Sequence, residues 1–123
     1  MKTMNQTTGV RLRVVLAPGV ALGPGKADLL DGIRETGSIA AAGRRMKMSY
    51  RRAWSLVEAM NAAFEAPVVE TSRGGAEGGG ARLSETGEAV LALYRRMQDE
   101  AVAATAGSRA DMAAMLGDVS GET

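Results

Sequence analysis

Apolar residues recur at helical spacing through most of the chain, interrupted by short runs that alternate or carry turn residues. The helical pattern and the serine, glycine and proline residues that bound it predict helices at 26–35, 39–45, 50–64 and 84–106. The remaining apolar runs predict strands at 10–16, 68–73 and 81–83. We therefore expect one α+β domain, mainly helical, over 10–106, with a disordered N-terminus over 1–9 and a tail over 107–123 that holds a short helix around 110–116.

The two central helices predict a helix-turn-helix. Ser38 and Ser49 stand immediately before them, where a side-chain oxygen can accept from the unpaired amides of the first turn. Residues 46–48 form the corner between the helices. On the second helix the spacing gives an inward face of Ala53, Val57, Met60 and Phe64 and an outward face that includes Arg51, Arg52 and Ser55.

This outward face lies in a basic stretch. Between Thr36 and Val57 the chain has no acid and five cations: Arg44, Arg45, Lys47, Arg51 and Arg52. A helix that enters the DNA major groove by its N-terminus needs this arrangement, because arginines bind guanine edges or phosphates and the helix dipole favours a phosphate there. The alternative is a solvated, charged face on an ordinary helical hairpin.

A glycine-rich segment joins the two later strands. The run GGAEGGG at 74–80 permits positive φ angles and close backbone approach, and Arg73 and Arg82 flank it. After a helix-turn-helix, this hairpin predicts a wing whose arginines contact phosphates or the minor groove. A loop that contacts nothing is the alternative, and Glu77 at the tip opposes a phosphate contact because like charges repel.

The last predicted helix is longer than a small domain needs. Ser84 precedes it as an N-cap, and its apolar positions are Val90, Leu91, Leu93, Tyr94, Met97, Ala101 and Ala104. We expect part of this stripe to pack on the core and part to pair with a second subunit. A dimer suits a small DNA-binding protein because two half-sites multiply specificity.

Composition narrows the function classes. The net charge is +1, so any contact with nucleic acid must come from local charge, and the absence of cysteine and histidine removes thiolate chemistry and the commonest general base. No two acids are spaced so that they would meet at one catalytic site. The glycines before Lys26 lack the spacing of a phosphate-binding loop. No apolar run suits a membrane span or a secretion signal. We expect a cytoplasmic protein that is not an enzyme and holds no metal or cofactor.

The chain resembles the N-terminal DNA-binding domain of the ModE-type molybdate-responsive transcriptional regulators in two segments, TGSIAAAGRRMKMSYRRAWSLVEAMN and GGAEGGGARLSETG. The GSI start, the SYRRAW segment and the glycine-rich wing before a Ser-x-x-Gly helix start carry the resemblance, which covers about 11–106. It implies a winged helix-turn-helix that is dimeric through its helices, like the related LysR-type domains. On the family pattern 73–82 match the wing, and the start of the recognition helix is matched by Ser49, Tyr50, Arg51, Arg52 and Ser55.

Three departures from the family pattern bear on function. Full-length members carry molybdate-binding modules after this domain and this chain ends before one could form, which argues against direct oxyanion sensing. The alternatives are a molybdate signal from a separate sensor subunit, one from a full-length relative in a mixed dimer, and no molybdate response. Lys47 occupies a corner where helix-turn-helix proteins often have glycine, and a left-handed conformation there would cost roughly 1 kcal/mol. Glu77 lies where related wings are basic or glycine.

We predict a dimeric transcriptional regulator that binds double-stranded DNA. Major-groove contacts are expected from Arg51, Arg52 and Ser55. Phosphate and wing contacts are expected from Ser49, Tyr50, Arg44, Arg45, Lys47, Arg73 and Arg82. The alternative is a winged-helix module that binds another regulator or a sensor subunit through its long helix. Such a docking surface would expose apolar or aromatic anchors on the second helix, whereas this one exposes arginines and small residues.

Overall fold

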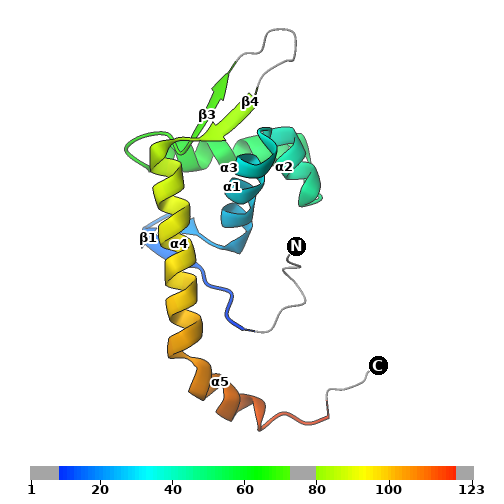
Figure 1. Cartoon of the computed structure of the whole chain (residues 1–123), viewed down its shortest axis with the longest axis vertical. Coiled ribbons are helices and arrows are strands. Elements are labelled where there is room, and N and C mark those ends of the chain that lie inside the picture. Colours follow the sequence, from blue (N-terminus) through cyan, green and yellow to red (C-terminus); the bar gives the residue numbers. More distant parts are fainter. Residues whose placement is uncertain (1–8, 73–79, 119–123) are drawn as a thin grey trace.

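The computed structural model describes residues 9–72 and 80–118, which form five helices and four strands. Two antiparallel hairpins, β1 (Val14–Ala17) with β2 (Val20–Leu22) and β3 (Val69–Ser72) with β4 (Gly80–Leu83), flank a helical body. The helical body consists of α1 (Pro24–Thr36), α2 (Ile39–Arg45) and α3 (Tyr50–Ala63). From this body α4 (Glu85–Ala104) extends along one side, and α5 (Ala106–Ala113) follows at its far end (Figure 1).

The core is built around α1. This helix contacts α2, α4, β2 and β4, and its apolar face is fully buried, as the helical spacing predicts: Ala27, Leu29, Leu30 and Ile33. A Cβ on Gly32 would lie 2.9 Å from the Cβ of Ala42, so the missing side chain lets α1 and α2 pack closely. Gly37, with a φ of 74°, ends α1 in the left-handed conformation that glycine adopts without strain.

α2 and α3 form the predicted helix-turn-helix. Ser38 accepts a hydrogen bond from the Ala41 amide, and Ser49 accepts one from the Arg52 amide, each at 3.0 Å. Lys47 at the corner has a φ of 60°, which is the left-handed conformation considered for it from the sequence. Each helix therefore begins at the predicted residue because its own N-cap serine satisfies an amide of the first turn.

The β3–β4 hairpin is the predicted pair of strands after α3 and forms the wing. Asn61 on α3 holds its base, because the Asn61 Oδ1 accepts from the amides of Val68 and Val69 at 2.8 and 3.0 Å. On the other strand the Ala81 amide donates to the Gly37 carbonyl at 2.9 Å. The wing is thus bonded both to α3 and to the turn between α1 and α2, and the whole arrangement is a winged helix-turn-helix.

The start of α4 packs against the segment that leads into the wing. Ser84 caps the helix by accepting from the Gly87 amide at 2.9 Å, and its hydroxyl donates to the Pro67 carbonyl at 2.6 Å. A Cβ on Gly87 would lie 2.0 Å from the Val68 carbonyl oxygen. The Ser-x-x-Gly helix start therefore has a packing reason: the serine bonds the preceding loop and the glycine leaves room for its backbone.

The prediction for the N-terminal strand is wrong in extent and in part of its pattern. The strand begins at Val14, and 17–25, which the sequence predicts as turn, contains β2. The pairing register shifts between Val15 and Ala17, so the alternation is broken there and Leu16 is 53% exposed instead of buried. Gly19, with a φ of 80°, closes the hairpin.

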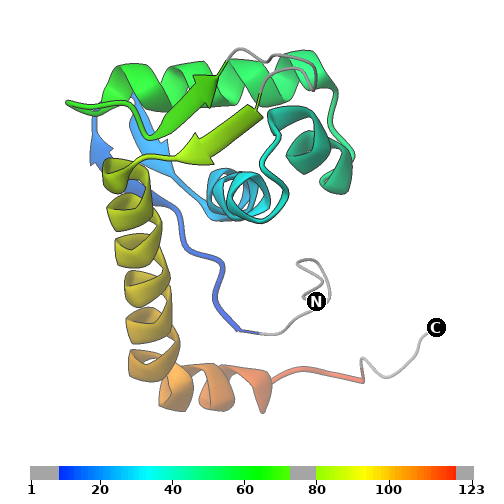
Figure 2. The same cartoon turned by 45° about the horizontal axis from the view of Figure 1, so that its top comes forward.

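The two chain ends differ in how far the structure describes them. The expected disordered N-terminus falls on 1–9, of which 1–8 lie outside the described residues. The short helix of the tail is α5, which begins four residues earlier than 110 because the chain turns at Thr105, whose hydroxyl donates to the Ala101 carbonyl at 2.7 Å. In Figure 2, α5 turns away from the axis of α4.

Candidate nucleic-acid interface

Burial of the inward face of α3 determines the direction in which its outward face points. Ala53, Val57 and Met60 are buried in the core, and α3 packs on α2, so the opposite side of α3 faces solvent. Arg51, Arg52 and Ser55 are exposed, as predicted. Tyr50, whose ring lies 6.4 Å from that of Trp54, is 54% exposed at the start of the helix.

The predicted cations differ in their partners. Arg44, Lys47, Arg51 and Arg52 have no ion pair within the described part of the chain. Arg45 instead pairs with Glu35 on α1 at 2.8 Å. Arg51 and Arg52 lie in the first turn of α3, Lys47 lies at the corner before it, and Arg44 lies in the last turn of α2. The first turn of α3 carries no acid, and the helix dipole adds a positive partial charge there.

Ser49 has a structural task that limits its other contacts. Its side-chain oxygen caps α3, so a lone pair is already used in a hydrogen bond from the Arg52 amide. The hydroxyl hydrogen remains available to an acceptor outside the helix, such as a phosphate oxygen.

Of the two arginines predicted for the wing, Arg82 lies within the described residues. Arg82 is exposed on β4, and its Nε donates to Glu70 on the facing strand at 3.2 Å. Arg73 and Glu77 fall in 73–79 and lie outside the described residues.

Glu35 and Glu70 are site residues that the sequence reasoning missed. A signal existed for Glu70, because the hairpin register sets it directly opposite Arg82. Glu35 meets Arg45 only because α1 and α2 pack together, so no local pattern marks that pair.

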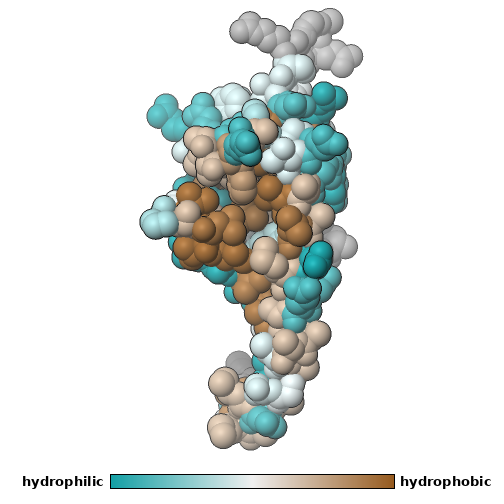
Figure 3. Space-filling model, turned by 90° about the vertical axis from the view of Figure 1, so that its left-hand side faces the viewer, coloured by the Kyte–Doolittle hydropathy of each residue, from teal (hydrophilic) through white to brown (hydrophobic). Residues whose placement is uncertain are grey.

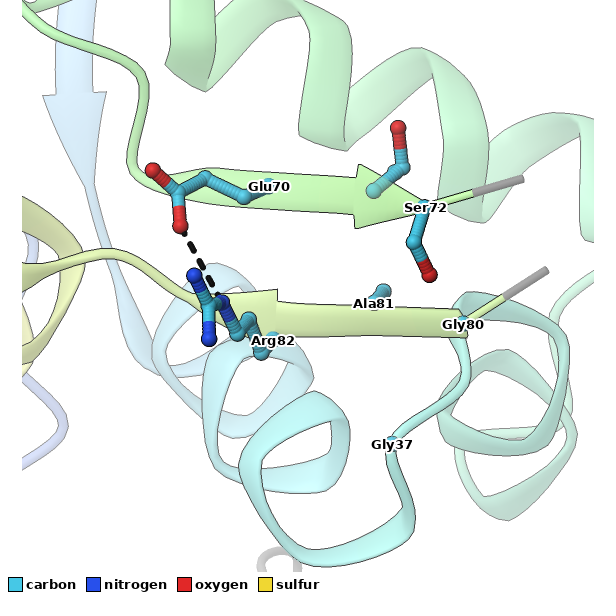
Figure 4. A pocket seen from close by; sticks show the side chains of 7 residues that line it. Gly37, Glu70, Ser72, Gly80, Ala81 and Arg82 are labelled. Atoms are coloured by element: carbon cyan, nitrogen blue, oxygen red, sulfur yellow. Dashed lines mark hydrogen bonds and ion pairs between the residues drawn. The ribbon is translucent and has the colours of Figure 1, made fainter. Parts of the chain in front are cut away.

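A groove of about 610 Å³ lies beside the wing (Figure 4). Its lining combines the α1–α2 turn with both wing strands: Gly37, Glu70, Thr71, Ser72, Gly80, Ala81 and Arg82. Arg82 and Glu70 point toward one another across the two strands in Figure 4. The groove therefore presents hydroxyls and a guanidinium beside the helix-turn-helix.

A separate apolar surface lies away from these cations. Figure 3 shows apolar residues gathered on the side of the molecule where β1 and α4 lie. The exposed large apolar residues of these elements are Val15, Leu16, Leu93 and Val102. The predicted α4 stripe is thus divided: Leu91 and Tyr94 are buried in the core, whereas Leu93 is 53% exposed.

The described residues contain no cluster of three or more acids that could hold a metal ion. None of the helices in 9–72 and 80–118 combines the length and apolar character that a membrane span requires.

Comparison with known proteins gives consistent matches. No family model matches the chain. Curated relatives include the molybdenum-pterin-binding protein MopB of Rhodobacter capsulatus, 46% identical over 76 residues, which are 62% of this chain and 28% of that protein. The transcriptional regulator ModE of Haemophilus influenzae is 36% identical over 89 residues, covering 72% of this chain and 35% of its own length. The DNA-binding transcriptional dual regulator ModE of Escherichia coli K12 is 37% identical over 71 residues, 58% of this chain and 27% of that protein.

Solved structures agree on the fold. A crystal structure of a CbnR_DBD–DNA complex matches with a TM-score of 0.53 and 26% identity, covering 73% of this chain and 95% of that one. Full-length CbnR in complex with its target DNA matches with a TM-score of 0.50 and 22% identity, over 72% of this chain and 27% of that one. The chain spans about a third or less of the length of the curated relatives described above.

Proposed function

From the similarity of this chain to the ModE-type transcriptional regulators, we propose that it is a sequence-specific DNA-binding regulator of transcription that acts as a homodimer. The recognition helix is α3, which enters the major groove by its N-terminus. Arg51, Arg52 and Ser55 contact base edges, and Ser49 and Tyr50 contact the phosphates at the edge of the groove.

The observation that carries this proposal is the group of unpaired cations around the start of α3. Arg44, Lys47, Arg51 and Arg52 lack a carboxylate partner in the described residues, so binding phosphates costs them no existing ion pair. Each cation that meets a phosphate releases counterions, which supplies affinity at low salt. Arg45 contacts the backbone after exchanging Glu35 for a phosphate.

The wing contributes a second contact on the flanking backbone or minor groove. Arg82 faces Glu70 in the free protein and exchanges this exposed carboxylate for a phosphate on binding. Exposed ion pairs contribute only about 0–1 kcal/mol, so this exchange is easily offset. Arg73, which precedes the glycine-rich run in the sequence, is the second proposed wing contact.

The apolar surface of β1 and α4 supports a homodimer. Leu93 and Val102 are 53% and 36% exposed on a helix that extends beyond the helical body, and burying the exposed part of each would favour association in proportion to the apolar area removed from water. Two copies joined there would present two recognition helices to a DNA site with two half-sites.

A second function rests on the same apolar surface. A winged helix that binds another regulator or a sensor subunit would also leave Leu93 and Val102 exposed when alone. It would not require the four unpaired cations.

Selection of bound sites from random duplex DNA at two salt concentrations, with and without molybdate, tests the proposal. We expect enrichment of an inverted repeat whose affinity falls steeply with salt. A molybdate effect would place a sensing step on this chain. Weak binding without enrichment at both salts would contradict DNA recognition and favour the protein-interaction function.

A further inference from the structure

Arg95 bonds α4 to the helical body at the point where α4 leaves it. Its Nη2 donates to Asp28 Oδ1 at 3.0 Å and to Asp31 Oδ2, and its Nη1 donates to Gln98 at 3.2 Å. Asp28 and Asp31 lie one turn apart on α1, so the guanidinium binds two points of that helix. Arg95 is 31% exposed and its two acids are similarly covered, which limits screening by solvent.

The partners of Arg95 favour its charged form. Burial by itself would lower the pKa of Arg95, but the hydrogen bonds to Asp31 and Asp28 outweigh it and raise the pKa. Arg95 thus remains a charged donor at this contact, as arginine does throughout the physiological pH range.

A second ion pair joins the same two helices nearer the start of α4. Arg34 on α1 donates to Glu88 on α4 at 2.9 Å and to Asp31 at 2.9 Å. Glu88 and Arg95 are about two turns apart, roughly 10 Å along the helix axis. Leu91 and Tyr94, which lie between Glu88 and Arg95 in the sequence, are buried in the core. The Arg95 ion pairs are therefore the attachment to α1 that lies nearest the projecting end of α4.

Beyond Arg95, α4 runs away from the helical body (Figure 1). The nine residues from Arg96 to Ala104 extend about 14 Å, so a pivot of about 10° at Arg95 would displace the far end by about 2–3 Å. In a dimer formed through α4, both copies would contribute this displacement. If each recognition helix moved by a similar amount, the separation of the two would change by roughly 5 Å.

The helical body transmits this geometry to the DNA-binding elements. α1, which carries Asp28 and Asp31, packs on α2 through Gly32 and Ala42. The turn after α1 bonds the wing through the Gly37 carbonyl. A change in the angle between α4 and α1 therefore moves the helix-turn-helix and the wing together.

We propose that Arg95 is a positioning residue that sets the angle between α4 and the helical body, and thereby the separation of the two recognition helices. This inference rests on the proposed dimeric DNA-binding function. It predicts that losing the Arg95 guanidinium changes which half-site spacing is bound while leaving the half-site sequence unchanged.

The separation is measured with spin labels. The chain has no cysteine, so Ala62→Cys gives one label per copy on the exposed side of α3, outside the proposed DNA contacts. Pulsed dipolar spectroscopy on the full chain then reports the distance between the two copies without DNA. The variants are Arg95→Met, Arg95→Lys as the conservative replacement, and Arg96→Met as a matched control, since Arg96 is 71% exposed and pairs only within α4 among the described residues.

We expect a narrow distance distribution in the parent and in Arg96→Met. Arg95→Met should broaden or shift it by about 5 Å, and Arg95→Lys should restore it in part. A distribution unchanged by Arg95→Met would overturn the inference, even if that variant unfolds more readily, because a purely stabilising role predicts no change in distance. Asp28→Asn, which keeps the Asp31 bond, provides the same test if Arg95→Met fails to fold.

Site selection gives a second, independent measurement. Arg95→Met should select the same half-site sequence as the parent, but the spacing between the two half-sites should change or relax by about one to two base pairs, at about 3.4 Å each. Arg96→Met should keep the parental spacing. No inter-copy signal and no paired half-sites in the parent would overturn the dimer and this inference together. A parental pair whose spacing Arg95→Met leaves intact would overturn this inference alone.

Discussion

Single residues at backbone contacts determine how the elements meet. Gly87 has no room for a side chain, because its Cβ would lie 2.0 Å from the Val68 carbonyl oxygen. Lys47 accepts a φ of 60° at the helix-turn-helix corner, which costs roughly 1–2 kcal/mol in a residue other than glycine.

We expect Gly87→Ala to destabilise the protein by about 1–3 kcal/mol, because the Val68 backbone or α4 must move to admit the methyl group. Urea unfolding followed by circular dichroism measures the change. Gly25→Ala is the control, since its Cβ would meet nothing within 4 Å. Equal stabilities for the two variants would show that α4 tolerates a shift at this contact.

At the base-contact scale, Arg51→Ala should relax base preference at one position of the operator and cost about 1–3 kcal/mol there if Arg51 binds a guanine. Affinity measurements against a panel of single-base operator variants give the result. An unchanged preference at every position would remove Arg51 from base recognition.

At the scale of elements, the wing is attached at its base and charged along its strands. Asn61 and the Gly37 carbonyl bond the two strands to the helical body. Arg82 and Glu70 face each other across the hairpin. The base of the wing is therefore held against the helical body by hydrogen bonds. The ion pair between Arg82 and Glu70 is exposed, so Arg82 can exchange Glu70 for a phosphate.

Arg82→Ala should weaken binding to all DNA sequences alike and reduce the slope of log affinity against log salt by about 1, because one phosphate contact is lost. Titrations at several salt concentrations, with Arg96→Ala as the control arginine outside the interface, measure it. A slope that matches the parent would place Arg82 away from the phosphates.

The contact between α4 and the N-terminal segment depends on a buried phenol. The Tyr94 hydroxyl donates to the Leu12 carbonyl at 2.7 Å, and burial raises the pKa of Tyr94 while nearby Arg95 opposes the shift. Above a pH of about 10 the unfolded chain loses the phenol proton more readily than the folded one, so the folded state binds more protons and stability falls as pH rises.

Tyr94→Phe should therefore remove part of the loss of stability above pH 10, while costing about 0.5–1.5 kcal/mol at neutral pH through the missing hydrogen bond. Urea unfolding of both proteins between pH 8 and 11 gives the comparison. Parallel pH profiles would mean that the pKa of Tyr94 is the same in the folded and unfolded states.

At the scale of the whole molecule, charge and apolar surface are separated. The unpaired cations lie on α2, the start of α3 and the corner between them, whereas the exposed apolar residues lie on β1 and α4, which Figure 1 shows on the left of the molecule while α2 lies on the right. This separation allows one surface to bind DNA and another to bind a second copy.

Leu93→Glu should weaken dimerisation at least about tenfold, since it replaces an exposed apolar contact by a charge that must be desolvated. Ala92→Glu, the exposed neighbouring position, controls for added charge on α4. Sedimentation equilibrium measures both. If the two variants associate equally, the dimer does not use Leu93.

The helix-turn-helix, the wing strands and the start of α4 were predictable from the sequence because short-range interactions determine them. N-cap serines, 3.6-residue periodicity and glycine-rich turns act within a few residues, so Ser38, Ser49 and Ser84 mark their helices directly. The exposure of Arg51 and Arg52 follows from the same periodicity.

Only the tertiary structure decided which groups distant in sequence meet. The bulge that exposes Leu16, the bond between Arg45 and Glu35, and the attachment of Arg95 to Asp28 and Asp31 leave no periodic trace. They depend on the angles at which helices and hairpins pack, and those angles arise from the fit of whole faces such as α1 on α2. Local patterns determine what each element is, and close packing determines which of its side chains find partners.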